Sequence, residues 1–390
     1  MSNSRPLQAI AVALVLLACE AAYAHDPSAY GGLFRTRNWG ENWLNADVGL
    51  FLGAAVTLAI SPTDPNHLLL GSDAGVLVSR NGGRQWEREA PDLLFGAVFA
   101  VAFLQDGKHA VCATPGGVFR YDGSIWKAVA APSEAAPARA IRGGAGPRLY
   151  LIGRRAPFVS DDSGATWRRI EHDLPDEAEF TELAVVQQPR EVLYAVVDGV
   201  LMASDDQGLR WRELHIGTDG QRVEGLSLDP AGSGRLWIAA GDRVYRSDDG
   251  GRSWIRVGNS FPEAGTSVRG VAADPLATIL IAATHRGIYR SGDGGHTWHL
   301  LEDNLPVHLE ARSLVSDAAA PGTVYAGFAL MPYTELWRGA LEGGNLLSRV
   351  DPVSLAGGLA FLLLIILVGV LGARGLLRRA ARRDLNASEP

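Results

Sequence analysis

Seven tryptophans recur along the chain at nearly constant spacing, and this repeat constrains the fold more than any other feature. Each one ends a similar short segment, such as Ser-Asp-Asp-Gly-Gly-Arg-Ser-Trp at 247–254. Successive members stand 43, 40, 41, 44, 43 and 44 residues apart. They are Trp43, Trp86, Trp126, Trp167, Trp211, Trp254 and Trp298. A period of this length indicates a chain built from repeated supersecondary units.

Each unit contains the signals of four short strands. In the fifth unit, alternating apolar residues at 223–228 predict a first strand that ends at the turn signal Asp229-Pro230. Further strands are expected at 235–240, 243–246 and 254–257. Four antiparallel strands in a unit of about 40–45 residues are typical of a β-propeller blade. The 46 glycines and 20 prolines also favour an all-β fold.

The two ends of the repeat determine the number of blades. The first unit has only its last hairpin, from 33–35 through Trp43, whereas the last unit predicts strands at 312–315, 324–328 and 335–338. Joining these two partial units gives a seven-bladed ring without an open sheet edge. Whether 33–35 or 335–338 takes the third-strand position of the shared blade stays open at this point.

The first 24 residues predict a secretory signal peptide. An apolar run at 7–18 follows Arg5 and leads to Ala22-Tyr23-Ala24, so cleavage after Ala24 is expected. The alternative is Leu16-Leu17-Ala18-Cys19, which resembles a bacterial lipobox and would leave Cys19 lipidated. The propeller is then expected over residues 25–350.

A second apolar segment predicts a membrane anchor near the C-terminus. The 20 residues 354–373 carry no charge, which is enough to cross about 30 Å of hydrocarbon as a helix. Five arginines follow in the tail 374–390, which favours a cytoplasmic tail. We therefore predict a single-pass protein of a bacterial inner membrane, with its propeller in the periplasm.

Charge argues against nucleic acid as a partner. The tail has five arginines and two acidic residues, Asp384 and Glu389, so its net charge is +3. The net charge of the whole chain is −7, so the exported part has a net charge of −10. An acidic domain of this kind is unsuited to binding the phosphate backbone of a nucleic acid.

Cys19 and Cys112 are the only cysteines, so removal of the signal peptide leaves no pair for an internal disulfide.

The tryptophan-terminated box predicts a tight hairpin turn. An aspartate can accept backbone N–H bonds across such a turn, and glycine supplies positive φ without steric cost. The tryptophan covers the hairpin with a large apolar face. The carboxylates lack the spacing of an EF-hand loop, so no calcium site is expected. We predict structural roles for Asp162, Trp167, Asp206, Trp211, Asp249, Trp254, Asp293 and Trp298.

The box resembles the Asp-box, or BNR, repeat: the segments 160–167 and 291–298 both fit Ser-x-Asp-x-Gly-x-Thr-Trp. Sialidase-like glycosidases, sortilin-type receptors and the photosystem II assembly/stability factor group use this repeat. Evenly spaced boxes in a single ring behind an export signal make the chain resemble the last group, over about residues 30–345. The resemblance implies a non-enzymatic propeller that binds, stabilises or helps to assemble a membrane-protein complex. The segment 354–373 departs from the soluble or lipid-anchored members of that group.

A sialidase-like glycosidase or a glycan-binding lectin is the alternative. Sialidases resemble one another in an opening Phe/Tyr-Arg-Ile-Pro motif, and the nearest text here, Phe34-Arg35-Thr36-Arg37, lacks Ile-Pro. The chain also has no G-x-S-x-G, no H-E-x-x-H, no P-loop and no paired-cysteine metal motif. We therefore expect no catalytic residues, no cofactor and no metal.

One face of the predicted ring gathers arginines. Connections between blades share this face with the turns from second to third strands, so the first-strand starts should surround the channel mouth: Val56, Phe99, Arg139, Thr181, Glu224, Arg269 and Arg312. Clustered arginines suit a carboxylate or an acidic protein segment, although each could instead pair with a neighbour such as Glu224 or Asp242. The loop 330–333 should add an exposed apolar element. The predicted partner-binding residues are Arg139, Arg154, Arg155, Arg243, Arg269, Arg286, Arg312 and Tyr333.

Overall fold

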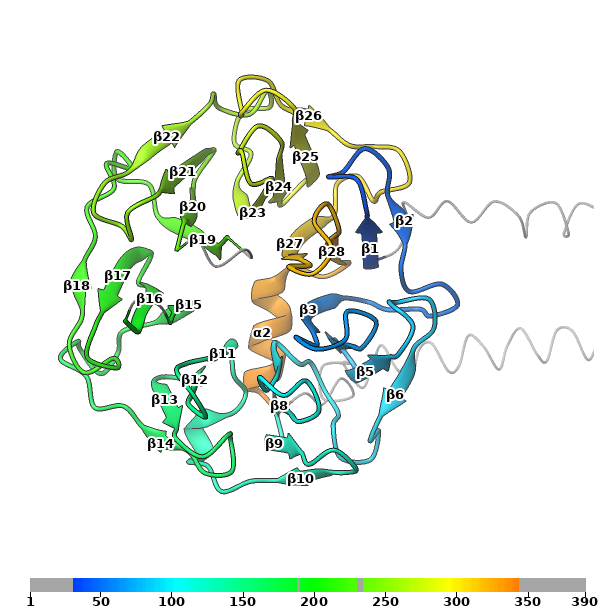
Figure 1. The fold of residues 1–390 in the computed structure, drawn as a ribbon, viewed down its shortest axis with the longest axis vertical. Helices are drawn as coiled ribbons and strands as arrows, with labels where there is room; N and C mark the ends of the chain where they lie inside the picture. Colours follow the sequence, from blue (N-terminus) through cyan, green and yellow to red (C-terminus); the bar gives the residue numbers. More distant parts are fainter. Residues whose placement is uncertain (1–30, 188–189, 230–233, 344–390) are drawn as a thin grey trace, which may run out of the picture. The chain divides into compact units, whose positions relative to one another are not determined.

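The computed structural model describes residues 31–187, 190–229 and 234–343 of the chain. Seven four-stranded antiparallel sheets stand as blades around a central channel (Figure 1), which confirms the predicted all-β, seven-bladed propeller. The predicted signal peptide, Cys19, the uncharged segment 354–373 and the tail 374–390 lie outside the described residues. Within the described ranges, no helix has the length and apolarity needed to cross a bilayer.

Blades 1 to 6 each use four consecutive strands, with the first strand nearest the channel (Figure 1). Blades 1 to 3 contain β3 (Ala55–Ile60), β4 (Leu68–Ser72), β5 (Gly75–Ser79) and β6 (Glu87–Glu89); β7 (Ala100–Phe103), β8 (Ala110–Thr114), β9 (Gly117–Tyr121) and β10 (Trp126–Ala128); and β11 (Ala140–Gly143), β12 (Leu149–Ile152), β13 (Pro157–Ser160) and β14 (Arg168–Arg169). Blade 4 contains β15 (Phe180–Val186), β16 (Val192–Val197), β17 (Val200–Ser204) and β18 (Arg212–Glu213). Blade 5 contains β19 (Val223–Leu228), β20 (Leu236–Ala240), β21 (Arg243–Ser247) and β22 (Ile255–Val257). Blade 6 contains β23 (Val268–Ala273), β24 (Leu280–Thr284), β25 (Gly287–Ser291) and β26 (His299–Leu300).

Blade 7 is shared between the two ends of the propeller. It contains β27 (Glu310–Ser316), β28 (Val324–Ala329), β1 (Gly32–Thr36) and β2 (Leu44–Asn45). β1 pairs with β28 from Gly32↔Phe328 to Thr36↔Val324. The N-terminal strand therefore takes the third-strand position, which settles the question that the sequence left open.

The strand predicted at 335–338 is wrong, because these residues lie in the helix α2 (Tyr333–Leu341). The edge of β28 that such a strand would need is already paired with β1. Tyr333, Trp337 and Ala340 recur at helical spacing, and all three are buried. The rings of Tyr333 and Trp337 meet Phe99 edge to face at 4.9 and 5.1 Å, so α2 docks on blade 2.

The box tryptophans join neighbouring blades in addition to covering their own hairpins. Trp211 of blade 4 packs in one cluster with Tyr150 and Val159 of blade 3, and its Nε1 donates to the Gly208 carbonyl at 2.9 Å. The other six box tryptophans occupy equivalent clusters, each against the preceding blade. The repeat thus sets both the turn and the contact between blades.

The box aspartates are held within their own hairpins. Ser291 Oγ donates to Asp293 Oδ1 at 2.8 Å and accepts from the Gly295 N–H at 2.8 Å. Asp293 Oδ1 also accepts from the Thr297 N–H at 2.9 Å, and these bonds hold the pKa of Asp293 well below its usual range. Asp162, Asp206 and Asp249 form the same network, and hydrogen bonds from Arg210 lower the pKa of Asp206 to about 2.

The closing blade also contains a buried carboxyl group. Asp47 is 2% exposed and its Oδ2 accepts from the Leu33 N–H of β1 at 3.1 Å. A Cβ at Gly32, where φ is +140°, would collide with this carboxylate. Burial raises the pKa of Asp47 to about 6.

We expect Asp47→Asn to raise the free energy of unfolding by about 1–3 kcal/mol at pH 7.5. The pKa of Asp47 is higher in the folded state than in the unfolded state, where it is about 3.9. The carboxyl group therefore makes its full contribution to the free energy of unfolding below pH 3.9, and this contribution is lost as the pH rises through 6. The advantage of the variant should therefore shrink as pH falls from 7.5 to 5. Urea denaturation at both pH values measures it, with the exposed Asp92→Asn as control. An equal gain at both pH values would exclude ionisation of Asp47 as its cause.

Candidate partner-binding site

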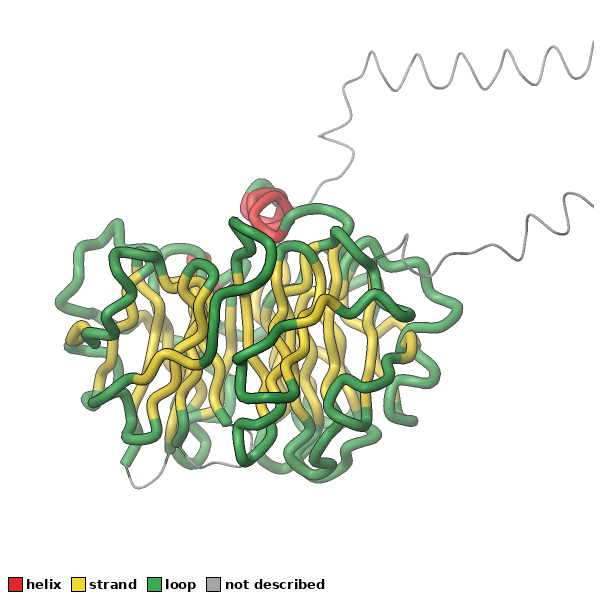
Figure 2. Tube along the Cα trace, turned by 90° about the horizontal axis from the view of Figure 1, so that it is seen from above, coloured by secondary structure: helices red, strands yellow, loops and turns green. Residues whose placement is uncertain are grey.

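The channel mouth lies on the face where blades connect and where second strands turn into third strands. α2 lies over one side of this mouth (Figure 2). The rim of the mouth consists of the turns between second and third strands, which present Arg154, Arg155, Arg243 and Arg286. Beneath the rim are the channel walls, formed by the first strands.

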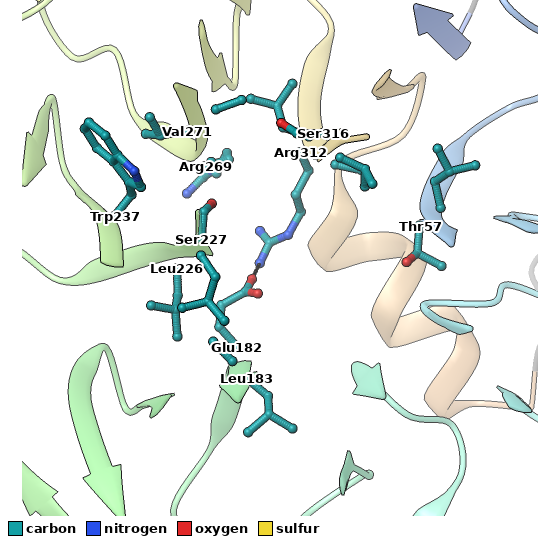
Figure 3. Close-up of a pocket in the computed structure, with 18 of the residues that line it drawn as sticks. Thr57, Glu182, Leu183, Leu226, Ser227, Trp237, Arg269, Val271, Arg312 and Ser316 are labelled. Atoms are coloured by element: carbon teal, nitrogen blue, oxygen red, sulfur yellow. Dashed lines mark hydrogen bonds and ion pairs between the residues drawn. The ribbon is translucent and has the colours of Figure 1, made fainter. Parts of the chain in front are cut away.

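A cavity of about 340 Å³ occupies the channel and is lined by residues from all seven blades (Figure 3). Of the mouth residues predicted from the sequence, Val56, Phe99, Arg139, Arg269 and Arg312 line it. In blade 4 the lining residue is Glu182, next to the predicted Thr181, and the register of β15 shifts between Phe180 and Glu182. The same shift occurs in β3, β19, β23 and β27, where the residues level with Glu182 are Thr57, Gly225, Gly270 and Ser313.

An ion pair crosses the channel. Arg312 of blade 7 donates from Nη2 to Glu182 Oε1 of blade 4 at 3.0 Å, as the dashed line in Figure 3 shows. The guanidinium also stacks at 4.0 Å on the ring of Tyr333 in α2. Burial opposes the charge of Arg312, but Glu182 and Tyr333 outweigh this effect, so the pKa of Arg312 is raised. Arg312 thereby connects opposite blades to the helix above them.

The other two mouth arginines also have partners. The Arg139 guanidinium lies 4.3 Å from the centre of the Trp337 ring and forms an ion pair with Glu179. Arg269 contacts Glu224, and its Nε lies 3.4 Å from Glu310 Oε1. Arg139 and Arg269 therefore pair with neighbouring acidic residues, which was the alternative interpretation of the sequence.

The rim arginines divide into paired and exposed residues. Arg243 contacts Asp219 at 2.6 Å, and Arg286 lies 3.8 Å from Glu263. Arg154 and Arg155 are exposed, and no acidic partner contacts them among the described residues. The structure thus brings the predicted arginines to one face. Of these seven arginines, Arg154 and Arg155 are the two whose guanidinium groups form no ion pair with the described residues.

Tyr333 does not belong to an exposed loop, which corrects the prediction. It is 9% exposed as the first residue of α2, whereas Leu330 and Met331 before it remain exposed. Phe99 and Arg312 cover its ring. The burial follows from the docking of the helix, because Tyr333 and Trp337 lie four residues apart on one helical face and both meet Phe99.

Three important side chains were not predicted from the sequence. Glu182 was not recognised because its partner Arg312 lies 130 residues away in the chain, and Trp337 because its segment was interpreted as a strand. Arg142 lines the cavity from the middle of β11. The sequence did contain a signal for Arg142, because blades 1, 4 and 6 have alanine at the equivalent strand position.

The described part of the chain contains no group of three or more His, Cys, Asp or Glu residues placed to hold a metal ion. Cys112 is buried within blade 2, and burial raises the pKa of its thiol. The charged groups of the mouth contact one another through arginine–carboxylate pairs.

The ring and its arginine-bearing mouth define the class of this protein: a seven-bladed propeller with one charged face. No family model matches the chain. It is 33% identical over 107 residues to the photosystem II assembly lipoprotein Ycf48 of Synechococcus sp. (strain CC9902). This match covers 27% of the chain and 32% of the relative, so the chain spans about a third of the length of that protein.

Solved structures share the fold. YCF48 bound to D1 peptide superposes with a TM-score of 0.54 at 19% identity, covering 71% of this chain and 94% of that one. The GH74 xyloglucanase from Xanthomonas campestris gives 0.54 at 20% identity, covering 74% of this chain and 55% of that one. At these identities the likeness shows the propeller fold alone. The chain thus resembles Ycf48 in sequence over one segment and in fold over 71% of its length.

Proposed function

We propose that this chain is a non-enzymatic propeller that binds, stabilises or helps to assemble a membrane-protein complex. The observation that carries the proposal is its resemblance to Ycf48 in both sequence and fold. That relative is a photosystem II assembly lipoprotein, and YCF48 has been solved with D1 peptide bound. For this chain the proposed partner is a subunit of a membrane-protein complex.

Location forms the second part of the proposal. A signal at 1–24 would export the chain, and a helix at 354–373 would hold the propeller at the periplasmic side of the inner membrane. A tether of this kind raises the effective concentration of the propeller beside membrane partners.

The rim around Arg154 and Arg155 is the proposed contact. Both residues occupy the turn between β12 and β13, with Arg154 fixed by a 2.7 Å bond from its backbone N–H to the Glu134 carbonyl. Exposed guanidinium groups can bind carboxylates in a bidentate manner, which suits an acidic segment of a partner. Arg139, Arg243, Arg269, Arg286 and Arg312 would support this face through the pairs that they already form.

Affinity purification of the full chain from solubilised membranes tests the contact. We expect Arg154→Glu with Arg155→Glu to reduce partner recovery at least about tenfold, because reversing two charges opposes an acidic segment. Arg84→Glu with Arg252→Glu is the matched control, since both are exposed on box turns at the opposite face. Recovery of the parent chain alone, or equal partner recovery with both double variants, would contradict the proposal.

Glycan processing is the second candidate, because the fold is shared with a GH74 xyloglucanase. Most glycosidases need two carboxyl groups flanking the scissile bond. The mouth carboxylates Glu182 and Glu310 instead contact Arg312 and Arg269, respectively. Turnover of xyloglucan or sialosides that disappears on Glu182→Gln would favour this candidate over assembly.

A further inference from the structure

The central cavity contains a cation that the proposed rim contact does not use. Five arginines line the cavity: Arg139, Arg142, Arg235, Arg269 and Arg312. Four of them contact carboxylates of the protein: Glu179, Asp248, Glu224 and Glu182, respectively. Arg142 has no such contact among the described residues. Its Nη1 donates to the Ile141 carbonyl at 2.9 Å, and this is one of five N–H groups on the guanidinium.

Arg142 lies below the mouth, within the channel. It forms the third pair of β11 with β12, opposite Tyr150. Tyr150 follows Leu149, which pairs with the box serine Ser160, and Tyr194, Trp237 and Ile281 hold the same place in blades 4 to 6. Opposite them stand Ala184, Ser227 and Ala272, which line the same cavity. Arg142 therefore puts a long cationic side chain at a level of the ring where these blades have small ones.

The surroundings of Arg142 disfavour an isolated positive charge. The side chain is exposed to the cavity, and the surrounding protein lowers the pKa of Arg142, an effect that the charge of Glu182 opposes only in part. An unpaired charge in such a place costs free energy that an anion can offset. Hydroxyl groups of Thr57, Ser227 and Ser313 line the cavity beside the apolar side chains.

We propose that the cavity binds a small monocarboxylate with a short apolar body, whose carboxylate pairs with Arg142. One unpaired guanidinium balances one negative charge, which favours a monoanion over a phosphate dianion. The leucine and valine side chains that line the cavity provide contacts for an apolar body. A volume of about 340 Å³ lies at the lower end of the range of about 300–1,000 Å³ for small-molecule sites, which excludes a folded partner.

Isothermal titration of the full chain in non-ionic detergent tests the site. The probes are sodium hexanoate, sodium benzoate and the neutral hexanamide, at constant ionic strength. We expect both carboxylates to bind, and hexanamide to bind at least about tenfold more weakly than hexanoate, because charge-assisted hydrogen bonds are roughly twice as strong as neutral ones. Arg142→Gln should weaken hexanoate binding at least about tenfold, and Arg142→Lys should recover part of this loss. Arg84→Gln, exposed on a box turn at the opposite face, should leave hexanoate binding unchanged.

Three results would overturn the site: no binding of either carboxylate at about 10 mM, equal binding of hexanoate and hexanamide, or unchanged hexanoate binding in Arg142→Gln. If Arg142→Gln does not fold, the comparison of hexanoate with hexanamide on the parent protein decides. The site is separate from the rim. Its failure would leave partner binding by Arg154 and Arg155 untouched, and loss of partner binding would leave the carboxylate titration unchanged.

Discussion

Trp298→Ala is expected to lower the free energy of unfolding by about 3–5 kcal/mol, the range for a large buried aromatic residue. Trp298 is 4% exposed and stacks on Phe261 with ring centroids 4.5 Å apart. Its Nε1 also donates to the Asn259 carbonyl at 3.2 Å. The substitution removes contacts between blades 5 and 6, so the loss should exceed that of a hairpin defect. Chemical denaturation followed by circular dichroism measures it.

Trp254→Ala provides the matched comparison in the preceding blade. Trp254 is only partly buried, and its Nε1 has no hydrogen-bond partner among the described residues. The loss should therefore be about half that of Trp298→Ala, since less apolar area is exposed to water. Equal losses at the two positions would show that blade contacts do not set the contribution of the box tryptophan.

Glu182→Leu is expected to lower the free energy of unfolding by about 2–4 kcal/mol, because it leaves Arg312 without its carboxylate partner. This loss of stability is smaller than that for breaking a fully buried ion pair, because the side chains of Arg312 and Glu182 are 19% and 21% exposed to the channel. Glu182→Leu with Arg312→Leu should recover most of the loss, because neither charge then remains. A double-mutant cycle by chemical denaturation gives the coupling energy.

The exposed pair Arg190–Asp205, at 3.1 Å, is the control for this cycle. Its side chains are 67% and 51% exposed, so removing either partner should change stability by about 0–1 kcal/mol. If Glu182→Leu costs no more than Asp205→Leu, the ion pair across the channel contributes nothing to ring stability.

The blade count followed from the sequence because every blade carries its own local signals. Each box fixes a hairpin through bonds between residues two and four positions apart, as in Ser291, Asp293 and Gly295. Such contacts do not depend on the rest of the molecule. The period of the tryptophans then sets the number of units, so the overall architecture needed no tertiary information.

The mouth was less predictable, because its contacts join residues far apart in the chain. Arg312 and Glu182 belong to blades on different sides of the ring, and no spacing in the sequence relates them. The helix α2 was also missed, since Tyr333 and Trp337 fit a short strand as well as one helical face until Phe99 is known to lie beneath them. A long side chain has several candidate partners in the sequence, and the folded ring determines which of them it contacts.

The pairing of β1 with β28 has a consequence for the order in which the molecule can form. Gly32 and Phe328 are about 300 positions apart, so the first strand to be synthesised must wait for nearly the last one. Until Val324–Ala329 has emerged, the edge of β1 lacks its hydrogen-bonding neighbour and could pair with another chain. A nascent chain arrested before residue 324 therefore cannot complete a toroid, however well its middle segments have folded.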